Sequence, residues 1–132
     1  MAEDSAEDFD LIHRALLRQI PGAWVVSVTS ASQAIAYLSG EGEYADRVRY
    51  PLAKLVLCDL KMSNGDGFML LKWMKLHPLF AKTPIIMMSG VYGPDGGKQA
   101  LAEGATAYVE KDHLVDDPLR FVSRVTHIIE NL

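Results

Sequence analysis

The chain has 132 residues, of which 49% are hydrophobic and 23% charged, and its net charge is −4. The length suits one domain with a real core, whereas the acidic charge gives no reason to expect a nucleic acid or an anionic membrane as partner. The single cysteine excludes an internal disulfide, no apolar run approaches the ~20 residues of a membrane span, and the acidic N-terminus lacks the apolar core of a secretory signal, so we expect a cytoplasmic protein.

Helical and strand patterns alternate along the chain. Helix ends are marked by the capping box that begins at Ser30, by the stop signal Gly40 and by Asp117, which precedes a proline. Periodicity and β-rich runs predict the remaining boundaries. The predicted order is helix 6–20, strand 24–28, a helix that ends before Gly40, a polar connector over 40–53, strand 55–58, helix 66–77, strand 84–88, a flexible loop over 91–97, a short helix that ends near Gly104, strand 107–110 and a last helix over 117–132.

This alternation predicts an α/β fold with a parallel sheet that helices cover on both faces. The run at 55–58 is apolar throughout, as expected of a strand buried on both faces. Cys58 within it is predicted to be a small core residue rather than a reactive thiol, because no basic residue or helix start is placed to lower its pKa.

Polar side chains stand at the ends of the predicted strands. Asp59 follows LVLC, Ser89 follows IIMM and Lys111 follows AYVE. Glu3 and Asp4 come just before the first helix. In open α/β sheets the carboxyl ends of the strands form the ligand-binding edge, so we expect these groups to converge there.

The converging groups fit phosphoryl transfer. Carboxylates without histidine or cysteine partners suit a hard divalent ion such as Mg²⁺. A carboxylate beside such an ion can attack a phosphoryl group, while the ion and a lysine stabilise the charge. Each residue alone has an ordinary explanation, as a helix cap, a turn residue or a solvated lysine. The combination at several strand ends carries the prediction.

The motifs AEDSAED, LVLCDLKMSNGDGF, PIIMMSG and GATAYVEK resemble the response regulator receiver family, the CheY-like superfamily, in order and spacing over essentially the whole chain. The resemblance implies a flavodoxin-like, doubly wound sheet of order 2-1-3-4-5 with about five helices. It also implies one receiver domain over residues 1–132, without an output domain. Such a protein is a phosphorylation-dependent switch of a two-component system that phosphorylates and dephosphorylates itself, rather than a turnover enzyme.

The resemblance assigns the phosphoacceptor and metal roles. Asp59 is similar to the phosphoacceptor of the family. Asp4 is similar to the direct Mg²⁺ ligand, and Glu3 supports the ion through water. Lys61 would offer its backbone carbonyl to the ion.

It also assigns the switch. Ser89 is similar to the switch hydroxyl, and Lys111 to the lysine that pairs with the phosphoryl group. Tyr108 is similar to the aromatic switch residue, although a half-buried strand aromatic is an equal interpretation. Lys61 and Val91 hold the positions that influence water attack on the acyl phosphate, and Val91 cannot orient a water molecule, so slow self-dephosphorylation is expected.

The partners follow from the same resemblance. A sensor histidine kinase would donate the phosphoryl group. The segments EGEYADRVRYP and LHPLFAKTP resemble single-domain regulators that pair with bacterial phytochrome kinases. The signal would pass to a downstream protein or a phosphotransfer protein, and the apolar last helix allows a homodimer through residues 108–132.

Three features of the chain depart from the family pattern. Ser63 and Asp112 stand where proline is usual, and a cis peptide before Asp112 would cost ~3 kcal/mol without proline. The family begins with a central apolar strand of about five residues, whereas only Met1 and Ala2 precede Glu3 here. Losing that strand would leave a gap of ~10 Å with unpaired backbone on both sides, unless a segment upstream of the recorded start, or another segment or chain, fills the slot.

Two other functions compete with the switch. A chain without a proper first strand could hold Asp4 poorly and serve as a protein-binding scaffold that takes no phosphate. A phosphatase of the haloacid dehalogenase type also forms an aspartyl phosphate, but it needs a second aspartate two residues after the nucleophile. Lys61 occupies that position here.

Overall fold

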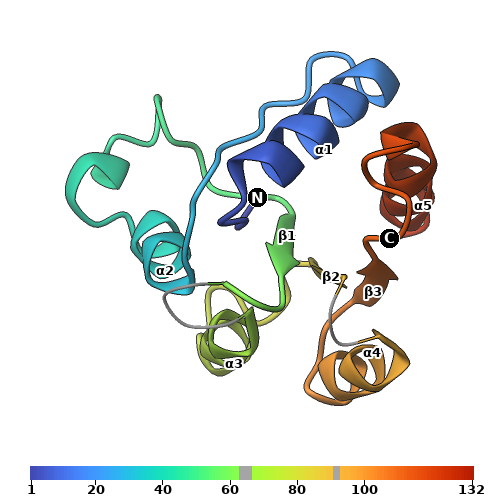
Figure 1. Cartoon of the computed structure of the whole chain (residues 1–132). Helices are drawn as coiled ribbons and strands as arrows, with labels where there is room; N and C mark the ends of the chain where they lie inside the picture. The colour runs from blue at the N-terminus through green and yellow to red at the C-terminus, as the bar shows by residue number, and fades with distance from the viewer. Residues whose placement is uncertain (63–66, 91–92) are drawn as a thin grey trace.

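The computed structural model describes residues 1–62, 67–90 and 93–132. Helices and strands alternate, and the helices lie on both faces of the sheet (Figure 1). The elements are α1 Ala6–Gln19, α2 Ala31–Ser39, the short 3₁₀ helix η1 Gly42–Ala45, β1 Val56–Asp59, α3 Gly67–Leu76, β2 Ile85–Ser89, α4 Gly93–Ala102, β3 Ala107–Glu110 and α5 Pro118–Glu130.

The three strands form a parallel sheet in the order β1-β2-β3. Alternate residues of β1 face opposite sides: Cys58 packs in the core with α2 and α3, whereas Leu57 packs in the core with α1 and α5. This confirms the doubly wound α/β fold. It also confirms that Cys58 is a fully buried core residue.

The first three residues extend the sheet. Ala2 forms parallel bridges with Val28 on one side and Cys58 on the other. The Ala2 amide donates to the Leu57 carbonyl at 2.8 Å, and the Glu3 amide donates to the Val28 carbonyl at 2.9 Å. Across the sheet the order is Val28, Ala2, β1, β2 and β3. This is the expected order 2-1-3-4-5, in which Ala2 marks the first strand position and Val28 the second. The gap expected from the short N-terminus is closed at the carboxyl edge of the sheet.

Two predicted elements differ from the structure. The strand expected over 24–28 is reduced to the single bridge between Val28 and Ala2. The segment beside it in the sheet offers only residues 1–3 for pairing. The flexible loop expected over 91–97 is wrong from residue 93 onward, where α4 already begins. A Cβ on Gly97 would lie 2.6 Å from the Tyr108 ring, so this glycine permits close helix packing. Ser63, Val91 and the rest of 63–66 and 91–92 lie outside the described residues.

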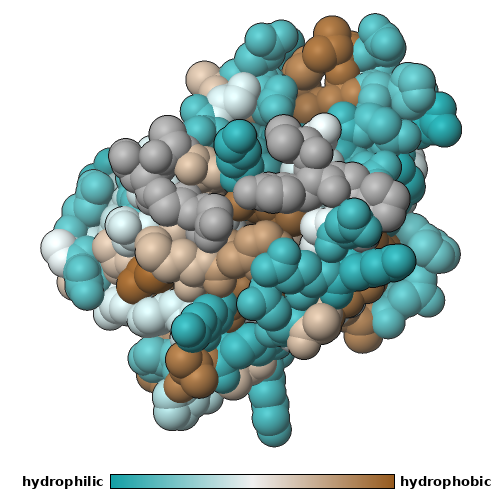
Figure 2. Space-filling view, turned by 60° about the horizontal axis from the view of Figure 1, so that its bottom comes forward, coloured by the Kyte–Doolittle hydropathy of each residue, from teal (hydrophilic) through white to brown (hydrophobic). Residues whose placement is uncertain are grey.

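One face of the molecule shows how polar and apolar residues are distributed on the surface (Figure 2). The face in Figure 2 is predominantly hydrophilic, with hydrophobic residues in separate areas. Among the described residues, no helix has the length and apolar character needed to cross a bilayer. Scattered exposed apolar side chains of this kind are ordinary on a protein surface.

Gly67 fixes how closely α3 approaches the end of β1. Its amide donates to the Leu60 carbonyl at 2.7 Å. A Cβ at this position would lie 2.3 Å from the Asp59 carbonyl oxygen and 2.7 Å from Met87 Cε. Backbone cannot yield as a flexible side chain can, so only glycine fits here.

We expect Gly67→Ala to destabilise the fold by about 1–3 kcal/mol, because the added methyl must displace the end of β1. Urea unfolding of the variant measures this. Gly90→Ala is the matched control, because a Cβ there would meet its nearest atom, Lys111 Cβ, only at 4.0 Å. Equal stability losses in the two variants would contradict the packing argument.

Candidate functional site

One lysine ammonium binds three carboxylates at the carboxyl edge of the sheet. Lys111 Nζ lies 2.6 Å from Glu3 Oε1, 2.9 Å from Asp59 Oδ2 and 3.0 Å from Asp8 Oδ2. The Lys111 side chain is 8% exposed and the Glu3 side chain is 0% exposed. Three separate parts of the chain, namely residues 3–8, the end of β1 and the segment after β3, thus meet at one buried charge.

Each segment reaches this place through the sheet. Asp59 is the last residue of β1, and its amide donates to the Ala2 carbonyl at 2.9 Å. Lys111 follows β3, and its amide donates to the Ser89 carbonyl at 3.0 Å. Parallel strands end at the same edge, so the ladder itself brings these residues together.

Burial and neighbouring charges shift the pKa values in the cluster. Burial raises the pKa of Glu3 to about 7, and Asp59 adds to the rise while Lys111 opposes it. Burial alone would lower the pKa of Lys111, but its hydrogen bonds with Glu3 and Asp59 leave that pKa raised overall. Lys111 is therefore a permanent cation at physiological pH, whereas Glu3 is poised between its two forms.

Three carboxylates could also hold a metal ion. One oxygen from each of Glu3, Asp4 and Asp59 lies within 4.8 Å of the others. Asp4 is exposed, whereas the other two are buried. An open cavity of about 540 Å³ adjoins them and is also lined by Lys61 and Lys111. The donors are all oxygen, which is the set that Mg²⁺ prefers.

The predicted switch residues lie next to this cluster. Ser89 is buried at the end of β2. Tyr108 is half-buried on β3, its ring lies against Gly97 of α4, and its hydroxyl is buried without a hydrogen-bond partner in the described part of the chain. Burial raises the pKa of the Tyr108 phenol. The ring therefore faces inward, against α4.

Sequence reasoning missed Asp8. Its backbone amide donates to the Ser5 hydroxyl at 3.2 Å, which caps α1. The spacing from Ser5 to Asp8 is that of a capping box, which was a signal in the sequence. The carboxylate nevertheless pairs with Lys111 instead of the helix terminus.

Asp112 follows Lys111 at the position where the family pattern usually has proline. No peptide bond within the described residues is cis, so the chain passes through Asp112 in the trans form. The Asp112 carboxylate pairs with Arg124 of α5, whose guanidinium also donates to the Glu110 carbonyl at 3.1 Å. His113 has φ 57 and lines the site cavity.

Comparisons with known proteins place the chain by sequence and by fold. The family model of the response regulator receiver domain matches residues 2–122. The gliding motility regulatory protein of Myxococcus xanthus is 35% identical over 75 residues, which are 57% of this chain and 10% of that protein, so the chain spans about a tenth of that relative.

Solved structures show the same fold. The phosphorylated cyanobacterial phytochrome response regulator RcpA superposes with a TM-score of 0.84 at 27% identity, over 94% of this chain and 86% of that chain. The response regulator RPA3017, in red light signalling of R. palustris, superposes with a TM-score of 0.85 at 24% identity, over 96% of this chain and 88% of that chain.

The raised pKa of Glu3 predicts a specific pH dependence of stability. Between pH 4.5 and about 7, the folded chain keeps a proton on Glu3 that the unfolded chain has released. Raising the pH through this window therefore lowers the contribution of Glu3 to the free energy of unfolding. Glu3→Gln lacks this contribution, so the stability difference between wild type and variant should change across the window.

Urea unfolding at several pH values measures the difference. The control is Asp10→Asn, which removes a half-exposed carboxylate that pairs with Arg14 of the same helix. Parallel stability curves for the wild type and Glu3→Gln would contradict the raised pKa.

Proposed function

The chain belongs to the response regulator receiver domain family, and from this premise we propose that Asp59 accepts a phosphoryl group and that the chain works as a phosphorylation-dependent switch. Receiver domains of two-component systems act in this way. The observation that supports Asp59 is its buried ion pair with Lys111, 2.9 Å long, at the carboxyl edge of the sheet.

The proposed transfer is a nucleophilic substitution at phosphorus. An Asp59 oxygen forms a bond to the phosphorus of a phosphohistidine as the bond from phosphorus to the imidazole nitrogen breaks, and the imidazole leaves. The product is an acyl phosphate. Lys111 keeps its proton throughout, because its raised pKa holds it charged, and it stabilises the phosphoryl oxygens from one side.

Mg²⁺ fits the residues that are present. Glu3, Asp4 and Asp59 supply only carboxylate oxygens, and the group already accommodates the positive charge of Lys111. These residues would hold the ion together with the backbone carbonyl of Lys61. When bound, the ion supplies further charge neutralisation at the phosphoryl oxygens. Direct binding by Asp4, with Glu3 acting through water, remains our prediction.

Phosphorylation would redistribute the contacts of Lys111. The phosphoryl group adds about −1.5 to −2 charge, which competes with Glu3 and Asp8 for the ammonium. The backbone of Lys111 is bonded to the Ser89 carbonyl, so a shift at one residue reaches the other. Tyr108 packs on α4 and would carry the change to the surface formed by α4, β3 and α5.

The proposed partners are proteins. A sensor histidine kinase supplies the phosphoryl group, and the likeness to RcpA, a cyanobacterial phytochrome response regulator, supports a kinase of the phytochrome type. The output would pass to a downstream protein or a phosphotransfer protein in the cytoplasm. A homodimer through residues 108–132 is a further proposal, supported by the apolar side chain of Leu132, which follows α5 and is 59% exposed.

We expect incubation with Mg²⁺ and acetyl phosphate to add the mass of one phosphoryl group to the intact chain. Asp59→Asn should abolish the addition, since it removes the nucleophile. Asp10→Asn, a surface change outside the cluster, should leave it intact. Intact-mass spectrometry reads all three. A wild-type chain that takes no phosphoryl group under any condition would support the scaffold instead.

We also expect the phosphorylated chain to lose its phosphoryl group slowly. Lys61 is exposed, and the apolar side chain of Val91, a residue outside the described ranges, cannot orient an attacking water molecule. The decay of the phosphorylated mass after removal of acetyl phosphate measures the lifetime. A half-life of only seconds would contradict this expectation.

A further inference from the structure

One side chain of α5 holds the segment that carries Lys111. Arg124 Nη2 donates to the Glu110 carbonyl at 3.1 Å and to the Asp112 carboxylate. These two acceptors stand immediately before and after Lys111 in the chain. The Arg124 guanidinium also lies over the Phe121 ring, 5.8 Å from its centroid. The two hydrogen bonds, the Arg124 clamp, thus hold both neighbours of the lysine.

The sheet holds the same segment from its other side. Among the described residues, β3 pairs only with β2, and the Lys111 amide donates to the Ser89 carbonyl at 3.0 Å. Neighbouring residues of a parallel strand direct their backbone groups to opposite edges, so the Glu110 carbonyl points away from β2. Arg124 therefore bonds β3 at the edge opposite β2.

The turn that follows Lys111 needs such support. His113 has φ 57, in the left-handed region that residues other than glycine rarely adopt, and its carbonyl accepts from the Asp117 amide at 2.7 Å. A backbone in this region persists where the surrounding contacts fix it. Asp112 does not restrict its own φ as a proline would, so the restriction comes from the contact of its side chain with Arg124.

We propose that Arg124 is a positioning residue for the phosphoryl transfer proposed above, on which this inference rests. It fixes the backbone over 110–112 so that the Lys111 ammonium stays directed at Asp59. Lys111 Nζ lies 2.9 Å from Asp59 Oδ2, so a small shift of the segment changes its distance from the reacting carboxylate. A displacement of about 1 Å near a reaction centre can cost on the order of a hundredfold in rate.

The clamp is better suited to positioning than to stabilising the fold. The Arg124 and Asp112 side chains are 39% and 41% exposed, and ion pairs so open to solvent contribute little to the free energy of unfolding. Lys111, in contrast, is buried among its carboxylate partners. Loss of the clamp should therefore change the rate of phosphorylation much more than the thermal stability.

The test measures the rate at which acetyl phosphate and Mg²⁺ phosphorylate variants of the intact chain. Arg124→Gln and Asp112→Ala should each slow the reaction about tenfold, because each releases the segment around Lys111. The double variant should be no slower than either single one, since both substitutions remove the same clamp. Arg120→Gln, which removes an exposed arginine one turn earlier on α5, should react at the wild-type rate.

The signs of these effects separate positioning from simple charge. Arg124→Gln removes a positive charge and Asp112→Ala a negative one, so an effect of charge on the anionic donor would have opposite signs in the two variants. Opposite signs would overturn the positioning role. A wild-type chain that is phosphorylated while Arg124→Gln reacts as fast as Arg120→Gln would overturn it as well.

The Mg²⁺ dependence separates positioning of Lys111 from a general loosening of the site. In Arg124→Gln the Mg²⁺ concentration for half-maximal rate should stay within about twofold of wild type, because the carboxylates are unchanged. The midpoint of thermal unfolding should fall by no more than about 4 °C, as expected for a partly exposed ion pair. A rise in the Mg²⁺ requirement as large as the loss of rate would overturn the proposal.

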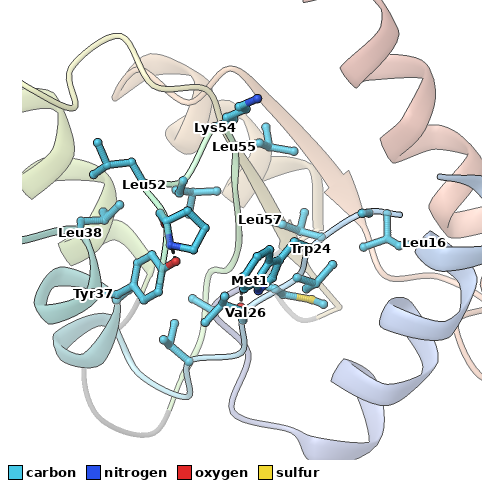
Figure 3. Close-up of a pocket in the computed structure, with 18 of the residues that line it drawn as sticks. Met1, Leu16, Trp24, Val26, Tyr37, Leu38, Leu52, Lys54, Leu55 and Leu57 are labelled. Atoms are coloured by element: carbon cyan, nitrogen blue, oxygen red, sulfur yellow. Dashed lines mark hydrogen bonds between the residues drawn. The ribbon is translucent and has the colours of Figure 1, made fainter. Parts of the chain in front are cut away.

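A separate apolar cavity supplies a control for stability. It has a volume of about 590 Å³, lies beside Met1 and is lined by Leu38 of α2 (Figure 3). Leu38 packs in the core with α3 rather than with α5. Leu38→Val should lower the midpoint of thermal unfolding by a few degrees without slowing phosphorylation. Equal slowing in Leu38→Val and Arg124→Gln would mean that lost stability alone slows the reaction, which would overturn the positioning role.

Hydrogen exchange at the Lys111 amide tests the clamp without phosphorylation. In Arg124→Gln this amide should exchange at least about tenfold faster than in the wild type, whereas Arg120→Gln should leave it unchanged. Unchanged exchange in Arg124→Gln would overturn the clamp. A wild-type chain that takes no phosphoryl group would instead contradict the proposed function, so the two failures are distinguishable.

Discussion

The buried contact of one ammonium with three carboxylates is the interaction on which the rest of the molecule depends. Lys111 binds Glu3, Asp8 and Asp59, and these residues lie on three parts of the chain that are distant in sequence: the N-terminal residues, the end of β1 and the segment after β3. A buried charge without a partner costs several kcal/mol, so each segment must arrive in position for the others to be stable. The same cluster is where a phosphoryl group and a divalent ion would bind. The same charged residues therefore stabilise the fold and form the proposed phosphorylation site.

Much of this could be predicted from the sequence, because parallel strands end at a common edge. That rule placed Asp59, Ser89 and Lys111 together from the apolar runs before them, and the structure brings them to one edge. Asp8 could not be predicted in the same way, because its contact depends on the rotation of α1 about its axis. Gly97 belongs to a segment predicted to be a loop, and only the neighbouring Tyr108 ring explains a glycine there.

At the N-terminus, the number of residues before Glu3 did not predict how the sheet is paired. Two residues before Glu3 implied a missing strand, yet Ala2 bridges both neighbours and holds the acidic residues in place. Pairing at the carboxyl edge is enough to position Glu3, whereas the amino half of the same line remains a cavity of about 590 Å³.

A structure determined with Mg²⁺ and beryllofluoride, a mimic of the phosphoryl group, tests the central claim most directly. The account predicts beryllium bound to an Asp59 carboxylate oxygen, with the Lys111 ammonium turned from Glu3 and Asp8 towards a fluorine, and Mg²⁺ among the carboxylates. A complex in which the mimic binds elsewhere, while Lys111 keeps all three of its carboxylate partners, would contradict it.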